Sequence, residues 1–144
     1  KNRKFKIEDT ATVSLIFKSG ALCTLNISDT IVAPWSYELT AGENPAYPTT
    51  NQSAYMIGGT KGSLQFPNLK YWFYKKERSW WNKIFVNEDK NKKDDNTLVN
   101  QIDHFADVVS KKVKPKVNGN DGLISLKIFA AITKSAKLGK KIRL

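Results

Sequence analysis

Polar and apolar residues alternate along two stretches near the beginning of the sequence, residues 10–17 and residues 21–28. The apolar positions of this alternation are Ala11, Val13, Leu15, Phe17, Ala21, Cys23, Leu25 and Ile27. A period of two is typical of β-strands whose two faces meet different surroundings. Lys-Ser-Gly lies between the two stretches and favours a tight turn, so the sequence predicts a β-hairpin here.

The opposite face of this predicted hairpin carries no charged residue. Its members are Thr12, Ser14, Ile16, Leu22, Thr24, Asn26 and Ser28. Charged residues make up 26% of the chain, and a sheet face that meets water normally includes some of them. We therefore predict that both faces are covered, one by helices and the other by another subunit or domain.

Three further short strands are predicted in residues 53–59, 62–66 and 69–74, joined by turn sequences that contain glycine, proline or asparagine. Together they predict an antiparallel meander. The segment 75–96 contains two adjacent tryptophans followed by a charged run. Its first part predicts an edge strand and its second part an exposed loop.

The apolar period becomes helical from Thr97 onward. One helix face is formed by Leu98, Ile102, Phe105 and Val109, and Asp-Asn residues before it predict an N-cap. A second helix is predicted with Asp121 as its cap and Gly139 as its end. Strands followed by helices predict an α+β fold, a mainly antiparallel open sheet with helices packed on one face and the other face available for oligomerisation.

Composition narrows the classes of protein that fit this pattern. A chain of 144 residues, 40% of them apolar and 11% aromatic, fits one globular domain. No apolar run reaches the roughly 18 residues of a membrane span, and the N-terminal residues do not resemble a secretory signal. The single cysteine, Cys23, rules out an internal disulfide, and with one histidine a Cys/His metal site cannot form. We expect a cytoplasmic protein without a membrane partner.

The net charge of +11 raises the possibility of nucleic-acid binding. Of the 24 basic residues, however, three are arginines, Arg3, Arg78 and Arg143, and the lysines are spread along the chain. Arginine is the residue that phosphate and guanine recognition favour. A dispersed set of lysines is more typical of a solvated surface, so we expect no nucleic-acid partner.

The loop from Trp35 to Pro48, Trp-Ser-Tyr-Glu-Leu-Thr-Ala-Gly-Glu-Asn-Pro-Ala-Tyr-Pro, is the most distinctive segment. We expect it to begin as a strand edge, to turn at Gly42 and to be stiffened by its two prolines. Its carboxylate, amide and aromatic side chains suit a hydroxyl-rich ligand. The candidate substrate-binding residues are Trp35, Glu43, Asn44 and Tyr47, with Tyr37 as a further aromatic surface. In the alternative, these aromatics pack under the loop or against a neighbouring subunit.

Recognisable catalytic motifs are missing. The Gly-Gly-Thr-Lys-Gly-Ser sequence has neither the P-loop ending nor the Gly-x-Gly-x-x-Gly spacing, and it lies between two predicted strands, so it predicts a hairpin turn. His104 lies off the apolar face of its predicted helix, which favours a solvated histidine over a general base. We assign no catalytic, cofactor-binding or metal-binding residue in this chain.

Three segments resemble the C-terminal domain of the Gfo/Idh/MocA oxidoreductases, the glucose-fructose oxidoreductase and inositol dehydrogenase family. They are residues 8–30, residues 55–67 and residues 101–144, and the most specific parts are Gly-Gly-Thr-Lys-Gly-Ser-Leu, His-Phe-Ala-Asp-Val-Val and the last helix with its Asn-Gly-Asn-Asp-Gly start. Members of this family have an N-terminal Rossmann domain that binds NAD(P). Their second domain contributes an open sheet to subunit contacts and part of the substrate site.

The resemblance implies that residues 1–144 are the substrate and oligomerisation domain of a longer NAD(P)-dependent dehydrogenase that acts on a sugar, cyclitol or related polyol. NAD or NADP would then be bound by the absent N-terminal domain, and the fragment alone would be inactive. The family's Gly-rich loop, its Glu-Lys-Pro motif and its Asp-x-x-x-His/Asn motif have no match here. The alternative is a free-standing, non-catalytic binding or scaffolding module of the same fold.

Overall fold

The computed structural model describes residue 4, residues 7–89 and residues 96–144. The chain divides into two units, residues 1–31 together with 102–144, and residues 32–101, and each is described by itself. Among the described residues, no helix has both the length and the apolar character that crossing a membrane requires.

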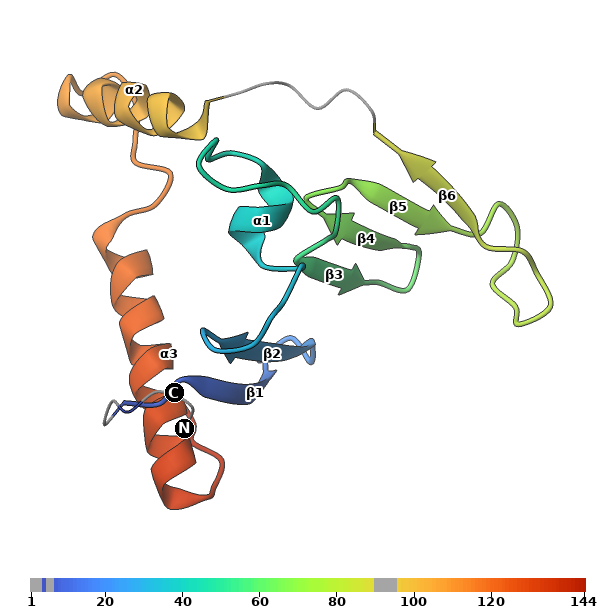
Figure 1. Ribbon diagram of the computed structural model, residues 1–144, viewed down its shortest axis with the longest axis horizontal. Coiled ribbons are helices and arrows are strands. Elements are labelled where there is room, and N and C mark those ends of the chain that lie inside the picture. Colours follow the sequence, from blue (N-terminus) through green and yellow to red (C-terminus); the bar gives the residue numbers. More distant parts are fainter. Residues whose placement is uncertain (1–3, 5–6, 90–95) are drawn as a thin grey trace. The chain divides into compact units, whose positions relative to one another are not determined.

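The first unit contains the predicted hairpin. Strands β1 (Thr10–Ile16) and β2 (Leu22–Ser28) pair antiparallel, with Val13 opposite Leu25 and Ser14 opposite Thr24 (Figure 1). Gly20 in the connecting turn has a φ of 89°, a left-handed conformation that glycine adopts without steric cost. The predicted hairpin and its turn are confirmed.

The uncharged face of the hairpin is exposed. Thr12 donates a hydrogen bond of 3.2 Å to Asn26 Oδ1, and the hydroxyls of Thr10 and Ser28 lie 2.9 Å apart. Beside these polar residues, the apolar side chains of Ile16 and Leu22 are 62% and 77% exposed. The hairpin therefore presents a mixed apolar and hydroxyl surface without charge, and what covers that surface stays a prediction.

Helix α2 (Thr97–Val109) begins where the change of period predicted. Asn96 accepts a hydrogen bond of 3.2 Å from Val99 N through its side-chain oxygen, which is the expected N-cap interaction. The other two residues of the predicted cap sequence, at positions 94 and 95, lie outside the described residues.

Helix α3 (Gly119–Leu138) starts three residues earlier than predicted. Asn118 is the N-cap, and Asp121 completes a capping box by accepting a 2.8 Å hydrogen bond from Asn118 N. The prediction that Asp121 itself is the cap was wrong, because aspartate at the third helical position satisfies the cap residue's own backbone N–H. The predicted end is confirmed, since Gly139 is left-handed with a φ of 61°.

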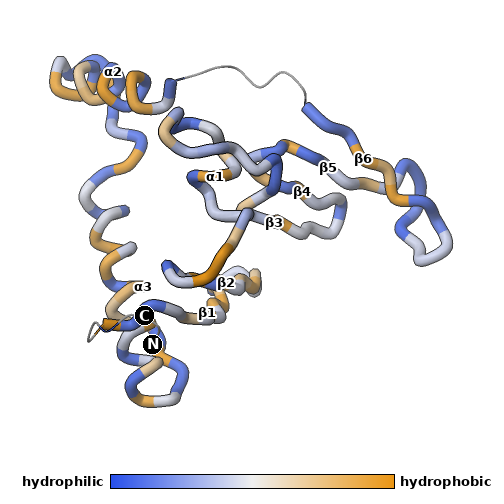
Figure 2. The backbone as a smooth tube through the Cα atoms, viewed as in Figure 1, coloured by the Kyte–Doolittle hydropathy of each residue, from blue (hydrophilic) through white to orange (hydrophobic). Residues whose placement is uncertain are grey.

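The apolar residues of α2 and α3 recur among hydrophilic ones along both helices (Figure 2). Neither helix has a fully buried side chain among the described residues. On α2, Ile102 and Phe105 of the predicted apolar face are each 67% exposed. The α+β class is confirmed by antiparallel sheets and helices, whereas the packing of these two helices on a sheet face stays a prediction.

The second unit is built on a four-stranded antiparallel meander with the order β3-β4-β5-β6 (Figure 1). Its strands are β3 (Tyr55–Gly58), β4 (Ser63–Phe66), β5 (Lys70–Phe73) and β6 (Phe85–Glu88). The first three confirm the predicted meander, and the edge strand forms later in its segment than expected. Within the described residues the strands form two sheets, one of β1 and β2 and one of β3 to β6.

A short helix, α1 (Tyr37–Ala41), occupies the start of the distinctive loop. The expectation of a strand edge at this place was wrong. Gly42, with a φ of 68°, ends the helix in the left-handed conformation, as a C-cap glycine does. Thr40 and Ala41, at the C-terminal end of α1, are buried with exposed fractions of 3% and 8%. The core of this unit therefore includes the end of this helix.

Candidate functional site

Three aromatic rings attach α1 to the four-stranded sheet. The ring of Tyr37 lies 6.0 Å from that of Tyr55 and 6.1 Å from that of Phe66, and it is nearly parallel to Phe66. Tyr55 and Phe66 are direct partners across β3 and β4. Such pairs add about 0.5–1.5 kcal/mol each beyond the burial of their area. This cluster fixes α1 on one face of the sheet.

The chain after α1 is held back against the helix by Thr50. Its backbone N–H donates to Leu39 O at 2.9 Å, and its hydroxyl donates to Pro34 O. The turn at Gly42 is tight, since a Cβ on this residue would lie 3.0 Å from Thr49 Cγ2. Residues 34–50 therefore form a closed loop with a fixed shape.

Glu43 is tied into this loop by both of its carboxylate oxygens. The hydroxyl of Tyr37 donates to one oxygen at 2.8 Å, and the hydroxyl of Thr97 donates to the other at 3.3 Å. The hydrogen bond to the Glu43 carboxylate, together with desolvation by burial, raises the pKa of the Tyr37 phenol above its ordinary value of 10.0. Tyr37 therefore stays protonated and remains a donor to Glu43.

Asn44 and Tyr47 follow in a turn of their own. The side-chain oxygen of Asn44 accepts from Ala46 N at 3.0 Å, and its carbonyl accepts from Tyr47 N at 3.1 Å. This is the Asx-type turn that asparagine favours. The side chain of Tyr47 is 46% exposed. Glu43 and Asn44 thus use their side chains inside the loop, and Tyr47 presents an aromatic surface.

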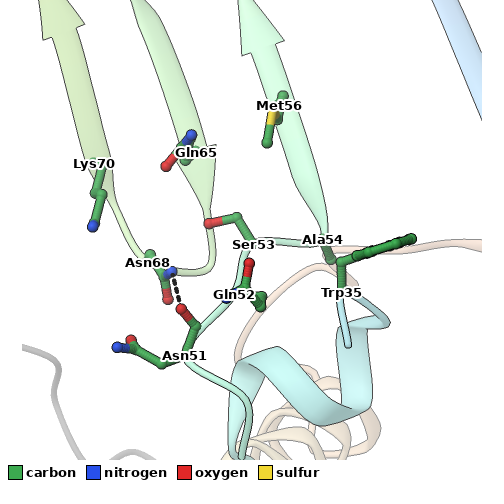
Figure 3. Close-up of a pocket in the computed structure, with 9 residues that line it drawn as sticks. All are labelled: Trp35, Asn51, Gln52, Ser53, Ala54, Met56, Gln65, Asn68 and Lys70. Carbon is green, nitrogen blue, oxygen red and sulfur yellow. Dashed lines mark hydrogen bonds between the residues drawn. The ribbon is translucent and has the colours of Figure 1, made fainter. Parts of the chain in front are cut away.

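A groove with a volume of about 410 Å³ lies beside Trp35 (Figure 3). Its volume is in the range of small-molecule sites. It is lined by Trp35, Asn51, Gln52, Ser53, Ala54, Met56, Gln65, Asn68 and Lys70. Of the four residues predicted to bind substrate, the structure places Trp35 in this groove, while the other three are not among its lining residues. Whether any of the four contacts a ligand stays a prediction.

One row of side chains across the sheet supplies three of the lining residues. Met56 is paired with Gln65, Gln65 with Lys70, and Lys70 with Glu88. Residues that face each other across neighbouring strands lie on the same face of a sheet. Tyr55, the neighbour of Met56, lies on the opposite face with the aromatic cluster, because successive side chains alternate. The groove and α1 are therefore associated with opposite faces.

Amide and hydroxyl groups dominate the polar lining of the groove. Asn68 Nδ2 donates to the carbonyl of Asn51 at 3.4 Å, which joins the β4–β5 turn to the segment before β3 (Figure 3). The hydroxyl of Ser53 is buried without a hydrogen-bond partner. Leaving such a group unpaired costs about 1–3 kcal/mol.

Sequence reasoning missed the amide residues of this groove. A signal was available in the run Asn51-Gln52-Ser53, where three hydrogen-bonding side chains follow one another. Gln65 and Lys70 gave no such signal, since each reads as the polar position of a strand. They join the groove through the register of β4 and β5, which local sequence does not specify.

The other candidates for chemistry have structural roles in this fold. The Gly-Gly-Thr-Lys-Gly segment is the predicted hairpin turn between β3 and β4, closed by a 2.9 Å bond from Gly59 N to Gly62 O. His104 is half-buried, and its Nε2 accepts from Lys116 N at 3.1 Å. Among the described residues, no three or more His, Cys, Asp or Glu side chains form a cluster that could hold a metal ion. Cys23 is a free, half-buried thiol on β2.

Comparison with known proteins gives a family but no individual relative. No curated protein and no solved structure gives a significant match. The family model described as the oxidoreductase family, C-terminal alpha/beta domain, of the Gfo/Idh/MocA group matches residues 1–144. This covers the whole chain and agrees with the antiparallel sheets and helices. The chain therefore belongs to the Gfo/Idh/MocA oxidoreductase family, as its C-terminal alpha/beta domain.

Proposed function

We propose that this chain positions the substrate in an NAD(P)-dependent dehydrogenase that acts on a sugar, cyclitol or related polyol. The observation that carries this proposal is the groove beside Trp35, whose lining includes one aromatic side chain, four amide side chains and an unpartnered buried hydroxyl. Each amide has two donors and an acceptor, and a hydroxyl group both donates and accepts. Such a lining matches a ligand that carries several neighbouring hydroxyls.

The distinctive loop supports the groove in this proposal. Glu43 and Asn44 act as positioning residues, because their hydrogen bonds to Tyr37, Thr97 and Ala46 keep residues 34–50 in shape. Trp35 and Tyr47 offer flat surfaces to a sugar ring. The rigid loop lowers the entropy lost when a ligand binds.

The residues that the structure describes do not fit the dinucleotide. A pyrophosphate site of the Rossmann type needs a glycine-rich turn that opens a helix, whereas the glycine-rich turn here joins β3 to β4. In a dehydrogenase of this kind the nicotinamide carries the hydride. We assign NAD or NADP to an N-terminal domain of the parent enzyme and assign ligand orientation to this chain.

Subunit contact is the second role that we propose, with a second copy of this chain as the partner. It rests on the uncharged face of β1 and β2, where exposed Ile16 and Leu22 flank hydroxyl and amide side chains. A face without charge is less costly to remove from water than an ordinary surface. The parent enzyme is then a homo-oligomer, and a reducing cytoplasm suits its single free cysteine.

Kinetics of the intact oxidoreductase test the first role. Replacing Ser53 or Gln65 by alanine is expected to raise KM for the polyol by about threefold to tenfold, since each change removes one hydrogen bond of roughly 0.5–1.5 kcal/mol. The Kd for NAD(P)H, measured by fluorescence titration, should not change. Tyr47→Ala, which removes an aromatic surface, should also raise KM.

Asn87→Ala is the matched control, because Asn87 is exposed on β6 next to Glu88 and therefore on the sheet face opposite to the groove. It should leave KM unchanged. Unaltered KM in the Ser53 and Gln65 variants would contradict the assignment of the groove. A changed Kd for NAD(P)H would contradict the separation of the two binding functions.

A further inference from the structure

The groove contains a charge that is already neutralised. Of its nine lining residues in the described part of the chain, Lys70 alone is ionisable. Its Nζ lies 2.9 Å from Glu88 Oε1, and the two residues are direct partners across β5 and β6. An isolated lysine in a binding groove attracts anions, whereas the charge of a paired lysine is compensated by the carboxylate of its partner.

The pair is accessible enough for a ligand to meet it. The side chains of Lys70 and Glu88 are 35% and 43% exposed, and Lys70 lies beside Asn68 at one side of the groove (Figure 3). An anionic ligand that approached Lys70 would also approach the carboxylate of Glu88. It would have to displace this carboxylate or accept repulsion from it.

We propose that the Lys70–Glu88 pair makes the groove selective for uncharged polyhydroxylated ligands over the corresponding acids. This inference rests on the proposed function, because it specifies the ligand of the same groove. The amides and the Ser53 hydroxyl recognise hydroxyl groups of the ligand. The positive charge of Lys70, which would otherwise attract a ligand carboxylate, is compensated by Glu88. Glu88, which does not line the groove, is a specificity-determining residue that acts through Lys70.

D-glucose and D-glucuronate are a suitable pair of probes, since they differ in one position, a hydroxymethyl group in one and a carboxylate in the other. Their affinities are measured by NMR titration of the full chain at constant ionic strength. The signals followed are the side-chain amides of Asn51, Gln52, Gln65 and Asn68. For the wild type we expect glucose to shift these signals at lower concentration than glucuronate.

Glu88→Gln should raise the affinity for glucuronate by about fivefold, the effect of one uncompensated charge near a protein surface. The affinity for glucose should not change. Adding Lys70→Gln to this variant should return the glucuronate affinity to that of the wild type. Glu77→Gln is the matched control, because Glu77 is an exposed carboxylate in the β5–β6 loop that does not line the groove. It makes the same change in net charge and should alter neither affinity.

The outcomes separate this inference from the proposed function. In one outcome, glucose shifts the groove amides, but the wild type binds glucuronate as tightly as glucose or Glu88→Gln leaves the glucuronate affinity unchanged. The proposed charge selectivity is then wrong, whereas the assignment of the groove as a ligand site is supported. If neither sugar shifts these amides, both the assignment of the groove as a ligand site and the proposed charge selectivity are wrong.

Discussion

Thr24→Lys is expected to weaken self-association of the chain by about a hundredfold. Thr24 lies on the uncharged face of β2, opposite Ser14 of β1. In a two-fold interface each copy contributes the same residue, so one substitution brings two lysines into the contact. Like charges placed together in an interface cost several kcal/mol, and a loss of about 2.8 kcal/mol is a hundredfold in Kd.

Sedimentation velocity over a series of protein concentrations measures this effect. Thr60→Lys is the matched control, because it introduces the same charge at an exposed position in the β3–β4 turn. It should associate as the wild type does. A wild-type chain that stays monomeric at every concentration, or a Thr24→Lys variant that associates normally, would show that this face is not the contact between copies.

A large loss of stability is expected when Gly62 is replaced by alanine. Gly62→Ala should lower the free energy of unfolding by about 1–3 kcal/mol, the usual cost of forcing extra atoms into a packed site. A Cβ on Gly62 would lie 2.6 Å from the ring atoms Cε2 and Cζ of Tyr71. Tyr71 cannot move without loss, because its ring stacks on Phe73 with centroids 5.5 Å apart.

Thermal unfolding followed by circular dichroism gives the measurement, with a decrease of about 3–10 °C in Tm expected. Gly58→Ala in the same hairpin is the control, since its Cβ would meet Ser63 Oγ at 4.0 Å, an ordinary contact. Gly58→Ala should leave Tm nearly unchanged. Equal Tm values for the two variants would mean that the close approach of Gly62 to Tyr71 does not constrain the turn.

The local elements were predictable where sequence patterns are strong and nearby in the chain. The β1–β2 hairpin follows from the alternation of polar and apolar residues around a glycine turn, and α2 follows from its apolar period after Asn96. Helix α1 was missed because five residues are too few to show a period. Its position depends on Tyr37 packing against Tyr55 and Phe66, a tertiary contact that propensity does not report.

The candidate site was predicted in part. The sequence directed attention to the loop from Trp35 to Pro48, and Trp35 lines the groove. The remaining lining comes from the segment before β3, from strands β3 and β4, and from the β4–β5 turn with the start of β5. Gln65 and Lys70 meet because the register pairs them. Register between strands is a non-local property, so the pattern within each strand does not reveal the groove.

The proposed function requires that this chain hold a polyol and not the dinucleotide. Parallel titration of the chain with D-glucose and with NADH or NADPH tests it most directly. We expect glucose to shift the side-chain amides of Asn51, Gln65 and Asn68 in NMR spectra, while dinucleotide fluorescence shows no saturable change. Saturable binding of NADH or NADPH, with these amides unmoved by glucose, would contradict it.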